Sequence, residues 1–296
     1  MGTINNAVRL LAKRPSILIL TIVTSTVLCV MEYLMMTLLY SISMFKTGSP
    51  FDAYVNIIQF IVDTVLVPQT AVKIILALAV LVVAAALIFG FLLSGSFYIL
   101  TNAVQGKAKK PGSEFLAGVR RYFIKMVSIN LWTLCAVVIF IIYAVVATIP
   151  AAIFIDNAIS GEVNIVGGLL LFILTLVVLF FSFAFFRQYI SLWYPSAFIH
   201  KKNHFKAAKK IADTNFWSLL SRFIVFDVIL VVFDAVYVIA NFSMANAQVI
   251  SGVTSSVLLV VNIVFKTIFI AVLVCFVFSA FNRMNQEGLL DNKTAP

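Results

Sequence analysis

Charged residues are scarce in this chain of 296 residues, and their scarcity excludes an ordinary soluble domain. Only 11% of the residues are charged, and 63% are hydrophobic. A soluble domain averages about 25% charged residues. Such a chain has too little polar surface to face water, so we expect an integral membrane protein.

Histidine and cysteine are also few, and the usual signatures of a catalytic or metal centre are missing. His200 and His204 lie in a basic stretch without the HExxH pattern of zinc hydrolases, and we interpret them as solvated cytoplasmic residues. The three cysteines occupy apolar runs without metal-ligand spacing, so we interpret them as small core residues: Cys29, Cys135 and Cys275. No glycine-rich phosphate loop is present. The sequence therefore predicts no cofactor, no metal site and no enzymatic activity.

Long apolar segments are what the chain has in abundance. Each is long enough to cross a hydrocarbon core, which takes about 20 helical residues. The predicted spans are residues 16–42, 72–99, 126–150, 164–190, 216–241 and 253–281. The first run is too long for a cleavable signal sequence, which has about 7–15 apolar residues, so we expect a retained span. The predicted fold is all-α, with six transmembrane helices in a single membrane domain, residues 1–296.

The net charge of +10 is distributed as expected for membrane topology. Lys and Arg concentrate in the N-terminal arm and in the connections after the second and fourth spans, so both termini are predicted to be cytoplasmic. A nucleic-acid partner would need an exposed basic domain, which this sequence lacks. We expect basic side chains to face anionic headgroups on the cytoplasmic side: Arg120, Arg121, Lys125, Lys206, Lys209 and Lys210. Trp193 and Trp217, beside these clusters, suit the membrane interface.

A short basic, amphipathic segment precedes each odd-numbered span. These three lead-in segments are AVRLLAKRPSIL (7–18), GVRRYFIKMVSI (118–129) and AAKKIADTNFWS (207–218). We predict that they are interfacial helices that turn into the following spans. The chain would then contain three hairpin repeats, at about 4–110, 111–200 and 201–285, with a cytoplasmic tail at 286–296. The alternative is that the positive-inside rule alone places basic residues before alternate spans.

The stretch LWYPSAFIHKKNHFKAAKKIADTNFWSLL, residues 192–220, carries a family resemblance. It resembles the six-span membrane domain fused to some glycerophosphodiester phosphodiesterases, and it is similar to related stand-alone prokaryotic membrane proteins. GSEFLAGVRRYFIK looks like the same element one unit earlier. The resemblance implies a multi-pass module of a prokaryotic cell membrane. It transfers no catalytic residue, because phosphodiesterase activity in such fusions belongs to a separate soluble barrel.

Ionisable and amide side chains inside the spans form the candidate intramembrane site. These residues are Glu32, Asp227, Asp234, Asn262 and Lys266. Asp227 and Asp234 are seven residues apart and share one helix face. Asp227 and Lys266 fall at similar depth in consecutive spans, so we predict that they form an ion pair. Glu32 and Asp234 would then lack a partner.

Two polar stripes accompany these charges. Thr21, Ser25, Cys29 and Glu32 step along one side of the first span at helical spacing, and could face a cavity. The first external loop, residues 51–69, is predicted to form an interfacial helix with Asp52, Asn56, Gln59 and Asp63 toward water. Glycines in the second and fourth spans are expected to permit close helix packing: Gly90, Gly95, Gly167 and Gly168.

Three functions follow from this inventory. The favoured one is a non-enzymatic membrane module that binds lipids or a partner membrane protein. A small transporter or flippase that uses the buried acids and the lysine is the alternative. An intramembrane enzyme is the third, although the sequence offers no nucleophile or metal cluster for it.

Overall fold

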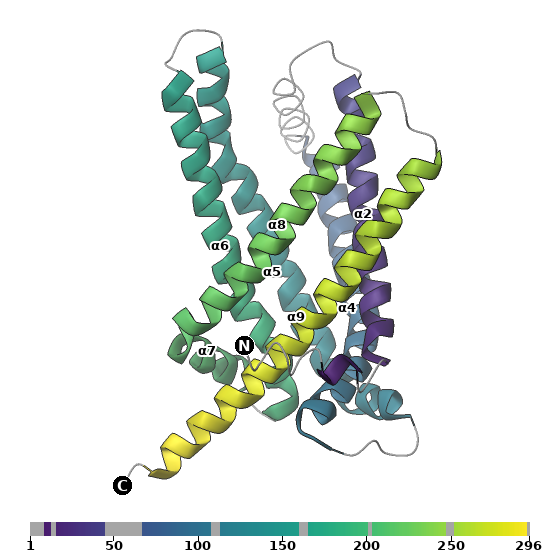
Figure 1. Ribbon diagram of the computed structural model, residues 1–296, viewed down its shortest axis with the longest axis vertical. Coiled ribbons are helices and arrows are strands. Elements are labelled where there is room, and N and C mark those ends of the chain that lie inside the picture. The colour runs from purple at the N-terminus through teal and green to yellow at the C-terminus, as the bar shows by residue number, and fades with distance from the viewer. Residues whose placement is uncertain are drawn as a thin grey trace. The chain divides into compact units, whose positions relative to one another are not determined.

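The computed structural model describes residues 9–12, 16–44, 67–107, 113–159, 165–200, 203–246 and 252–294. Every regular element in these ranges is helical. A single turn covers residues 9–12, and seven longer helices follow (Figure 1). They are α2 (Ser16–Met44), α4 (Pro68–Val104), α5 (Glu114–Ile159), α6 (Ile165–Ile199), α7 (His204–Thr214), α8 (Phe216–Asn246) and α9 (Gly252–Thr294).

Six of these helices are long and apolar enough to cross a membrane, which confirms the predicted number of spans. The candidate spans are Ile17–Leu34, Pro68–Val104, Glu114–Ala151, Val166–Ile199, Phe216–Asn241 and Ser256–Glu287. Many large apolar side chains on them are exposed, such as Ile88 at 61% and Ile139 at 67%. Apolar surface of this kind suits acyl chains rather than water. The chain is therefore a multi-pass membrane protein.

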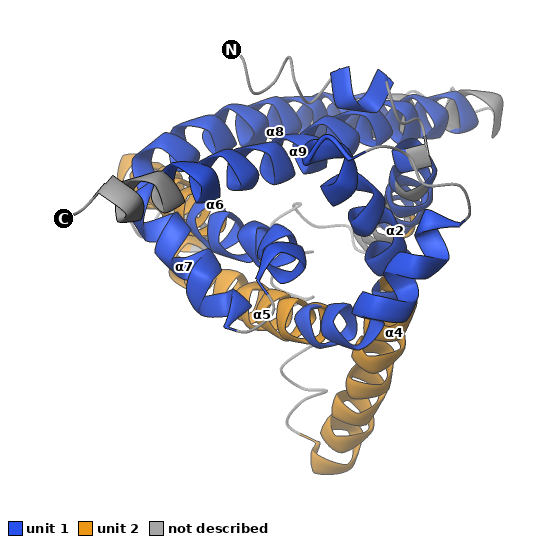
Figure 2. Cartoon of the chain, turned by 90° about the horizontal axis from the view of Figure 1, so that it is seen from below, with its two compact units in different colours: residues 1–33, 90–129, 184–296 blue, residues 34–89, 130–183 orange. Residues whose placement is uncertain are grey.

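The chain divides into two compact units (Figure 2). Unit 1 comprises residues 1–33, 90–129 and 184–296, and unit 2 comprises residues 34–89 and 130–183. The boundaries fall within α2, α4, α5 and α6, because a long helix takes part in more than one set of contacts. All the predicted charged site residues belong to unit 1.

Unit 1 contains the main hydrophobic core. Its largest fully buried side chains are Phe223 of α8 and Phe276 and Phe281 of α9, which have no exposed surface. Phe223 and Phe276 meet edge to face at 5.9 Å between ring centroids. Ala208 and Ala212 of α7 join the same core, since small side chains let this short helix lie close to α8 and α9.

Glycine allows α4 and α5 to approach closely within unit 1. A Cβ atom added to Gly90 would lie 2.4 Å from Val127 Cγ2, and one added to Gly95 would lie 2.3 Å from the Phe115 ring. Gly118 on α5 sits against the backbone of Gly95. The prediction of close packing is confirmed for the glycines of α4.

Unit 2 contains aromatic and hydroxyl contacts between α5 and α6. Phe140 on α5 and Phe183 on α6 have ring centroids 6.0 Å apart, and the Tyr143 and Ser182 hydroxyls are 3.4 Å apart. A Cβ atom added to Gly167 would lie 3.5 Å from the Phe154 ring, which is an ordinary van der Waals distance. The close packing that we expected at Gly167 is therefore not observed, because a side chain would fit at this position.

The three predicted lead-in segments adopt different structures. The third forms α7, a separate helix whose preceding residue Asn203 has a φ of 57°, a left-handed conformation that asparagine tolerates. The second is not a separate helix, because Glu114–Ile159 is one unbroken helix. Of the first, residues 9–12 form one turn and residues 13–15 are outside the described ranges. The predicted interfacial helix at 51–69 also lies outside the described residues, apart from its last three positions.

Candidate functional site

The polar stripe of α2 faces the interior of unit 1. Thr21, Ser25 and Cys29 are 2%, 0% and 0% exposed, which confirms the inward orientation predicted for this side of the helix. The hydroxyls of Ser25 and Thr267 of α9 form a buried hydrogen bond. One turn beyond Cys29 along this stripe lies Glu32, so the stripe leads directly to a charged group.

A four-residue cluster surrounds the ammonium group of Lys266. Its Nζ lies 2.6 Å from Glu32 Oε2 and 3.0 Å from Asp234 Oδ1. Asn262, one turn earlier on α9, donates from Nδ2 to the same Glu32 oxygen at 2.8 Å. Residues from α2, α8 and α9 thus meet at one point. We call Glu32, Asp234, Asn262 and Lys266 the lysine cluster.

Aromatic packing supports the lysine cluster. Phe233 and Phe265, the residues that directly precede Asp234 and Lys266, stack with ring centroids 3.6 Å apart. This stack fixes α8 against α9 at the level of the charges. The two helices contact one another and run alongside each other in Figure 1. The register of the stack therefore positions the aspartate next to the lysine.

The lysine cluster is only partly enclosed. The side chains of Glu32 and Asp234 are 22% and 34% exposed, while that of Lys266 is 11% exposed. With both acids ionised the cluster carries one excess negative charge. Carboxylates at membrane depth are costly unless they are paired or reach water. Chemically, this arrangement suits the uptake of one proton or of one small cation.

Asp227 belongs to a different ion pair, so the predicted Asp227–Lys266 pair is wrong. Asp227 is 1% exposed and pairs with Arg187 of α6. The Arg187 guanidinium also lies over the Phe223 ring, at 5.4 Å from its centroid. The expectation that Glu32 and Asp234 lack partners is also wrong, since both pair with Lys266.

Sequence reasoning missed Arg187 because it lies close to the end of the fourth predicted span. A basic residue three positions from a span end is usually assigned to the interface. The usable signal was the count of charges inside the spans, since Asp227 needed a cation and Arg187 lies within the predicted range 164–190. Gln188, which is fully buried and donates to the Phe216 carbonyl at 3.2 Å, was also missed.

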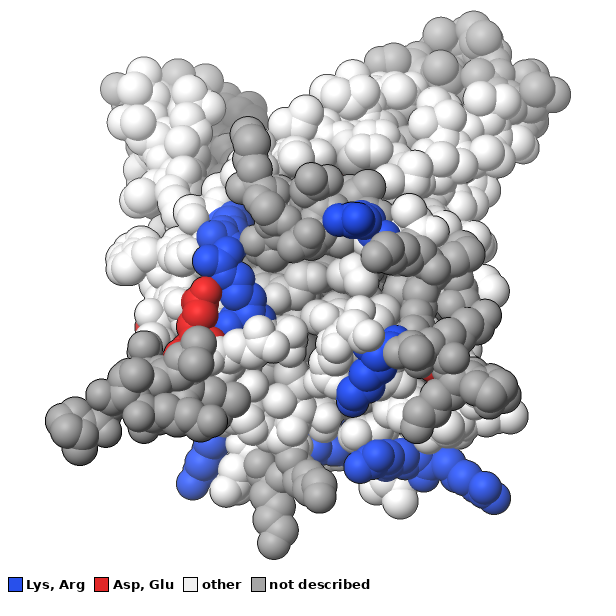
Figure 3. All heavy atoms as spheres, turned by 60° about the horizontal axis from the view of Figure 1, so that its bottom comes forward, with Lys and Arg blue, Asp and Glu red and all other residues white. Residues whose placement is uncertain are grey.

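Basic side chains gather at one end of unit 1, the face that comes forward in Figure 3. Five of the six predicted headgroup-facing residues are exposed: Arg120, Arg121, Lys206, Lys209 and Lys210. We call this region the basic end. Trp217, at the start of α8, is 79% exposed beside it. An exposed tryptophan next to lysines is typical of the membrane interface.

Lys125 does not face headgroups. Its Nζ donates to the carbonyl oxygens of Ala197 at 2.6 Å and His200 at 2.7 Å. These carbonyls end α6, where the last turn of a helix lacks internal donors and the helix dipole favours a cation. Lys125 therefore caps α6, which corrects its predicted role.

The two histidines are not fully solvated, in contrast to the prediction. Both are partly buried, and their Nε2 atoms lack solvent contact. The His204 ring lies 4.3 Å from that of Phe205, and the His200 ring lies 6.3 Å from that of Phe281. Burial lowers the pKa of His204, with smaller contributions from the charges of Lys125 and His200.

Among the described residues, no three His, Cys, Asp or Glu side chains come together as possible metal ligands. Cys29 and Cys275 are buried, as predicted, but Cys135 is exposed on α5. Its interpretation as a core residue was wrong, because an apolar run in a membrane helix includes its lipid-facing side.

The comparisons with known proteins add no family or fold. No family model matches the chain, and no curated protein or solved structure is significantly similar to it.

Proposed function

We propose that this protein is a non-enzymatic membrane module whose basic end binds anionic lipid headgroups in the cytoplasmic leaflet of a prokaryotic cell membrane. Both termini would lie on that side. The supporting observation is the exposed basic surface of α7 and of the start of α5, in a chain with six long apolar helices. Juxtamembrane Lys and Arg each contribute about 1 kcal/mol of attraction to an anionic leaflet.

The construction of α7 supports this proposal. Ala208 and Ala212 are buried against unit 1, which leaves Lys206, Lys209 and Lys210 on the opposite, exposed side. A helix held in this way presents three cations in fixed positions, so that headgroups do not have to order a flexible loop. The family resemblance noted for residues 192–220 covers this helix.

The test compares lipid retention by purified full-length protein and by a triple variant, Lys206→Gln, Lys209→Gln and Lys210→Gln. Native mass spectrometry would count the phosphatidylglycerol and phosphatidylcholine molecules retained after delipidation. We expect the wild-type protein to prefer phosphatidylglycerol, and the variant to lose much of that preference. Equal retention of the two lipids by the wild-type protein would refute the proposal.

Transport is the second candidate, favoured by the partly exposed lysine cluster with its excess acid. A proton-coupled transporter needs a carboxylate that can exchange a proton from within the membrane. Proteoliposomes with an internal pH dye would test it: the wild-type protein should carry protons, and Glu32→Gln should abolish the flux. Asp213→Asn is the matched control, because Asp213 is an exposed acid of α7 that contacts Tyr189 outside the cluster.

A further inference from the structure

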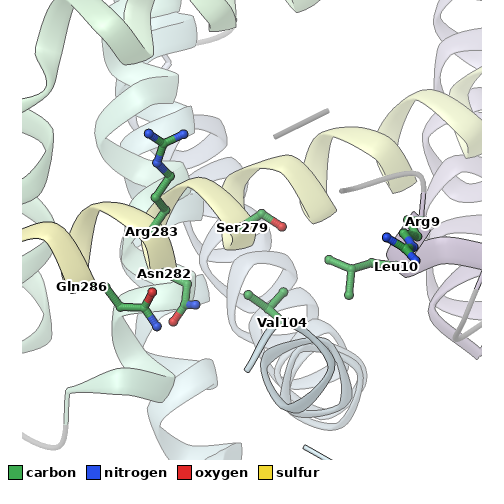
Figure 4. Close-up of a pocket in the computed structure, with 7 residues that line it drawn as sticks. All are labelled: Arg9, Leu10, Val104, Ser279, Asn282, Arg283 and Gln286. Atoms are coloured by element: carbon green, nitrogen blue, oxygen red, sulfur yellow. The ribbon is translucent and has the colours of Figure 1, made fainter. Parts of the chain in front are cut away.

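A pocket of about 420 Å³ lies in unit 1, between the one-turn helix at residues 9–12, the end of α4 and one side of α9. The one-turn helix at residues 9–12 contributes Arg9 and Leu10, and the last turn of α4 contributes Val104. The remaining wall is one side of α9 (Figure 4). It consists of Ser279, Asn282, Arg283 and Gln286.

The lining is rich in hydrogen-bond donors and carries positive charge. Two guanidinium groups, two carboxamides and one hydroxyl line the pocket, and no carboxylate is among the lining residues. Arg283 contacts Glu287 through Nε at 2.7 Å, and Figure 4 shows its terminal nitrogens on the other side of α9 from the Asn282 and Gln286 carboxamides. A change of rotamer would turn these donors toward a ligand. Arginine forks match the geometry of phosphate oxygens. The chemistry favours a phosphate-bearing anion.

A buried hydroxyl gives independent support for a ligand. Ser279 Oγ has no contact with solvent and no hydrogen-bond partner among the described residues. Leaving such a group unsatisfied is unfavourable, so buried hydroxyls usually have a partner. Figure 4 shows this hydroxyl on the side of α9 that faces Leu10 and Arg9. A small rotation of the Ser279 side chain would let an acceptor oxygen in the pocket satisfy this hydroxyl.

The apolar part of the lining favours a lipid over a free anion. Leu10 and Val104 lie between Arg9 and Arg283 in Figure 4, and Val104 is the last residue of the membrane-spanning helix α4. A lipid would place its phosphate among the polar groups and its glycerol region against these side chains. We infer that this pocket binds the phosphate group of an anionic phospholipid, as a defined site at the same end of unit 1 as the basic end. This inference rests on the proposed function and names its most specific site.

The experiment uses purified full-length protein, delipidated in detergent and titrated with phosphatidylglycerol, phosphatidylcholine or inorganic phosphate. Native mass spectrometry reports the most tightly bound molecule. We expect one phosphatidylglycerol to bind ahead of the others, and Arg9→Gln, Arg283→Gln and Ser279→Ala each to weaken it. The arginine variants should weaken binding at least about tenfold, since each removes charge-assisted hydrogen bonds.

Arg222→Gln on α8 is the matched control, because Arg222 does not line the pocket. The affinity of this variant for phosphatidylglycerol should stay within about twofold of wild type. Thermal unfolding without lipid checks that each variant is folded. Unchanged affinity in the folded pocket variants, together with a weaker triple-lysine variant, would overturn this inference and leave the proposed function standing. A wild-type protein with no preference for phosphatidylglycerol would overturn both. Equal affinity for inorganic phosphate would overturn the assignment to a lipid.

Discussion

Two acids on α8, seven residues apart on one face, occupy contrasting ionic sites. Asp227 is 1% exposed and has one cation, Arg187 of α6. Asp234 is 34% exposed and shares one cation, Lys266, with Glu32. The first site balances its charges in an enclosed space. The second has an excess acid and is partly open.

The contrast separates a structural role from a chemical one. A buried and balanced pair holds two helices in register, and adds little net stability over apolar side chains of similar size. An unbalanced, partly exposed cluster inside a membrane is the site that the alternative transport function would use. Identical residue types on one helix thus differ in their partners and in their exposure.

The largest expected effect is at the enclosed pair. Asp227→Leu would leave Arg187 buried without a counter-charge, which should reduce the free energy of unfolding by about 3–5 kcal/mol. Unfolding of the purified protein in mixed micelles, followed by circular dichroism, measures this loss. The double variant Arg187→Met and Asp227→Leu should recover most of it. If the double variant is as unstable as the single one, the loss does not come from the unpaired charge of Arg187.

At the lysine cluster we expect a smaller loss, and one that depends on pH. Lys266→Met would leave Glu32 and Asp234 close together without a cation, at a cost of about 1–3 kcal/mol at neutral pH. Partial exposure keeps this loss below that at the enclosed pair. Acidification should reduce the difference in unfolding free energy between Lys266→Met and the wild-type protein, because protonation removes the unpaired charge.

The matched control at the lysine cluster is Glu32→Gln, which leaves one acid and one base. It should be milder than Lys266→Met and should show little of its pH dependence. The same unfolding assay, repeated across a range of pH, compares the two variants. An acid-insensitive Lys266→Met variant would contradict the view of the cluster as proton-exchanging.

The hydrogen bond between Ser25 and Thr267 should contribute less than either ionic site. Ser25→Ala would leave the buried Thr267 hydroxyl without this partner, and we expect a loss of about 1 kcal/mol. Replacing both residues, with Thr267→Val, should cost less than the sum of the single changes. Strict additivity in the unfolding assay would show that the two hydroxyls do not interact.

The smallest effect is the pH dependence of stability that comes from His204. It must be separated from the pH dependence that comes from the lysine cluster. The pKa of His204 is lowered by burial, so the unfolded chain binds a proton at a higher pH than the folded one. Stability should therefore fall as the pH drops below about 6.5, and level off below the folded pKa. Partial exposure limits this to a fraction of 1 kcal/mol. His204→Gln should remove this component, and a variant with the full wild-type response would exclude His204 as its source.

The number of spans could be predicted because hydrophobicity over about 20 residues is a strong local signal. The behaviour of the lead-in segments could not be predicted, since local turn geometry decides whether a segment such as residues 118–129 is continuous with the following span or forms a separate helix. Asn203 and Asn215 bracket α7, whereas no such break interrupts Glu114–Ile159. A basic amphipathic pattern is compatible with both outcomes.

The membership of the lysine cluster was partly predictable. Helical spacing placed Asn262 near Lys266 and turned the stripe ending at Glu32 inward. Depth in the membrane alone could not predict which aspartate pairs with Lys266, because Asp227 and Asp234 are both within reach of that lysine. Rotation of α8 against α6, which brings Arg187 to Asp227, decided between them. Such rotation depends on side-chain packing among helices distant in sequence.

The contact between Glu32 and Lys266 joins residues 234 positions apart, in the first and last spans. At a translation rate of about 5–20 residues per second, the glutamate would wait about 12–47 s for its lysine to be made. During that interval the first helix holds an acid in the bilayer without its counter-charge. The nascent chain would therefore depend on shelter of this side chain at the insertion machinery, and translation of the last helix would complete assembly.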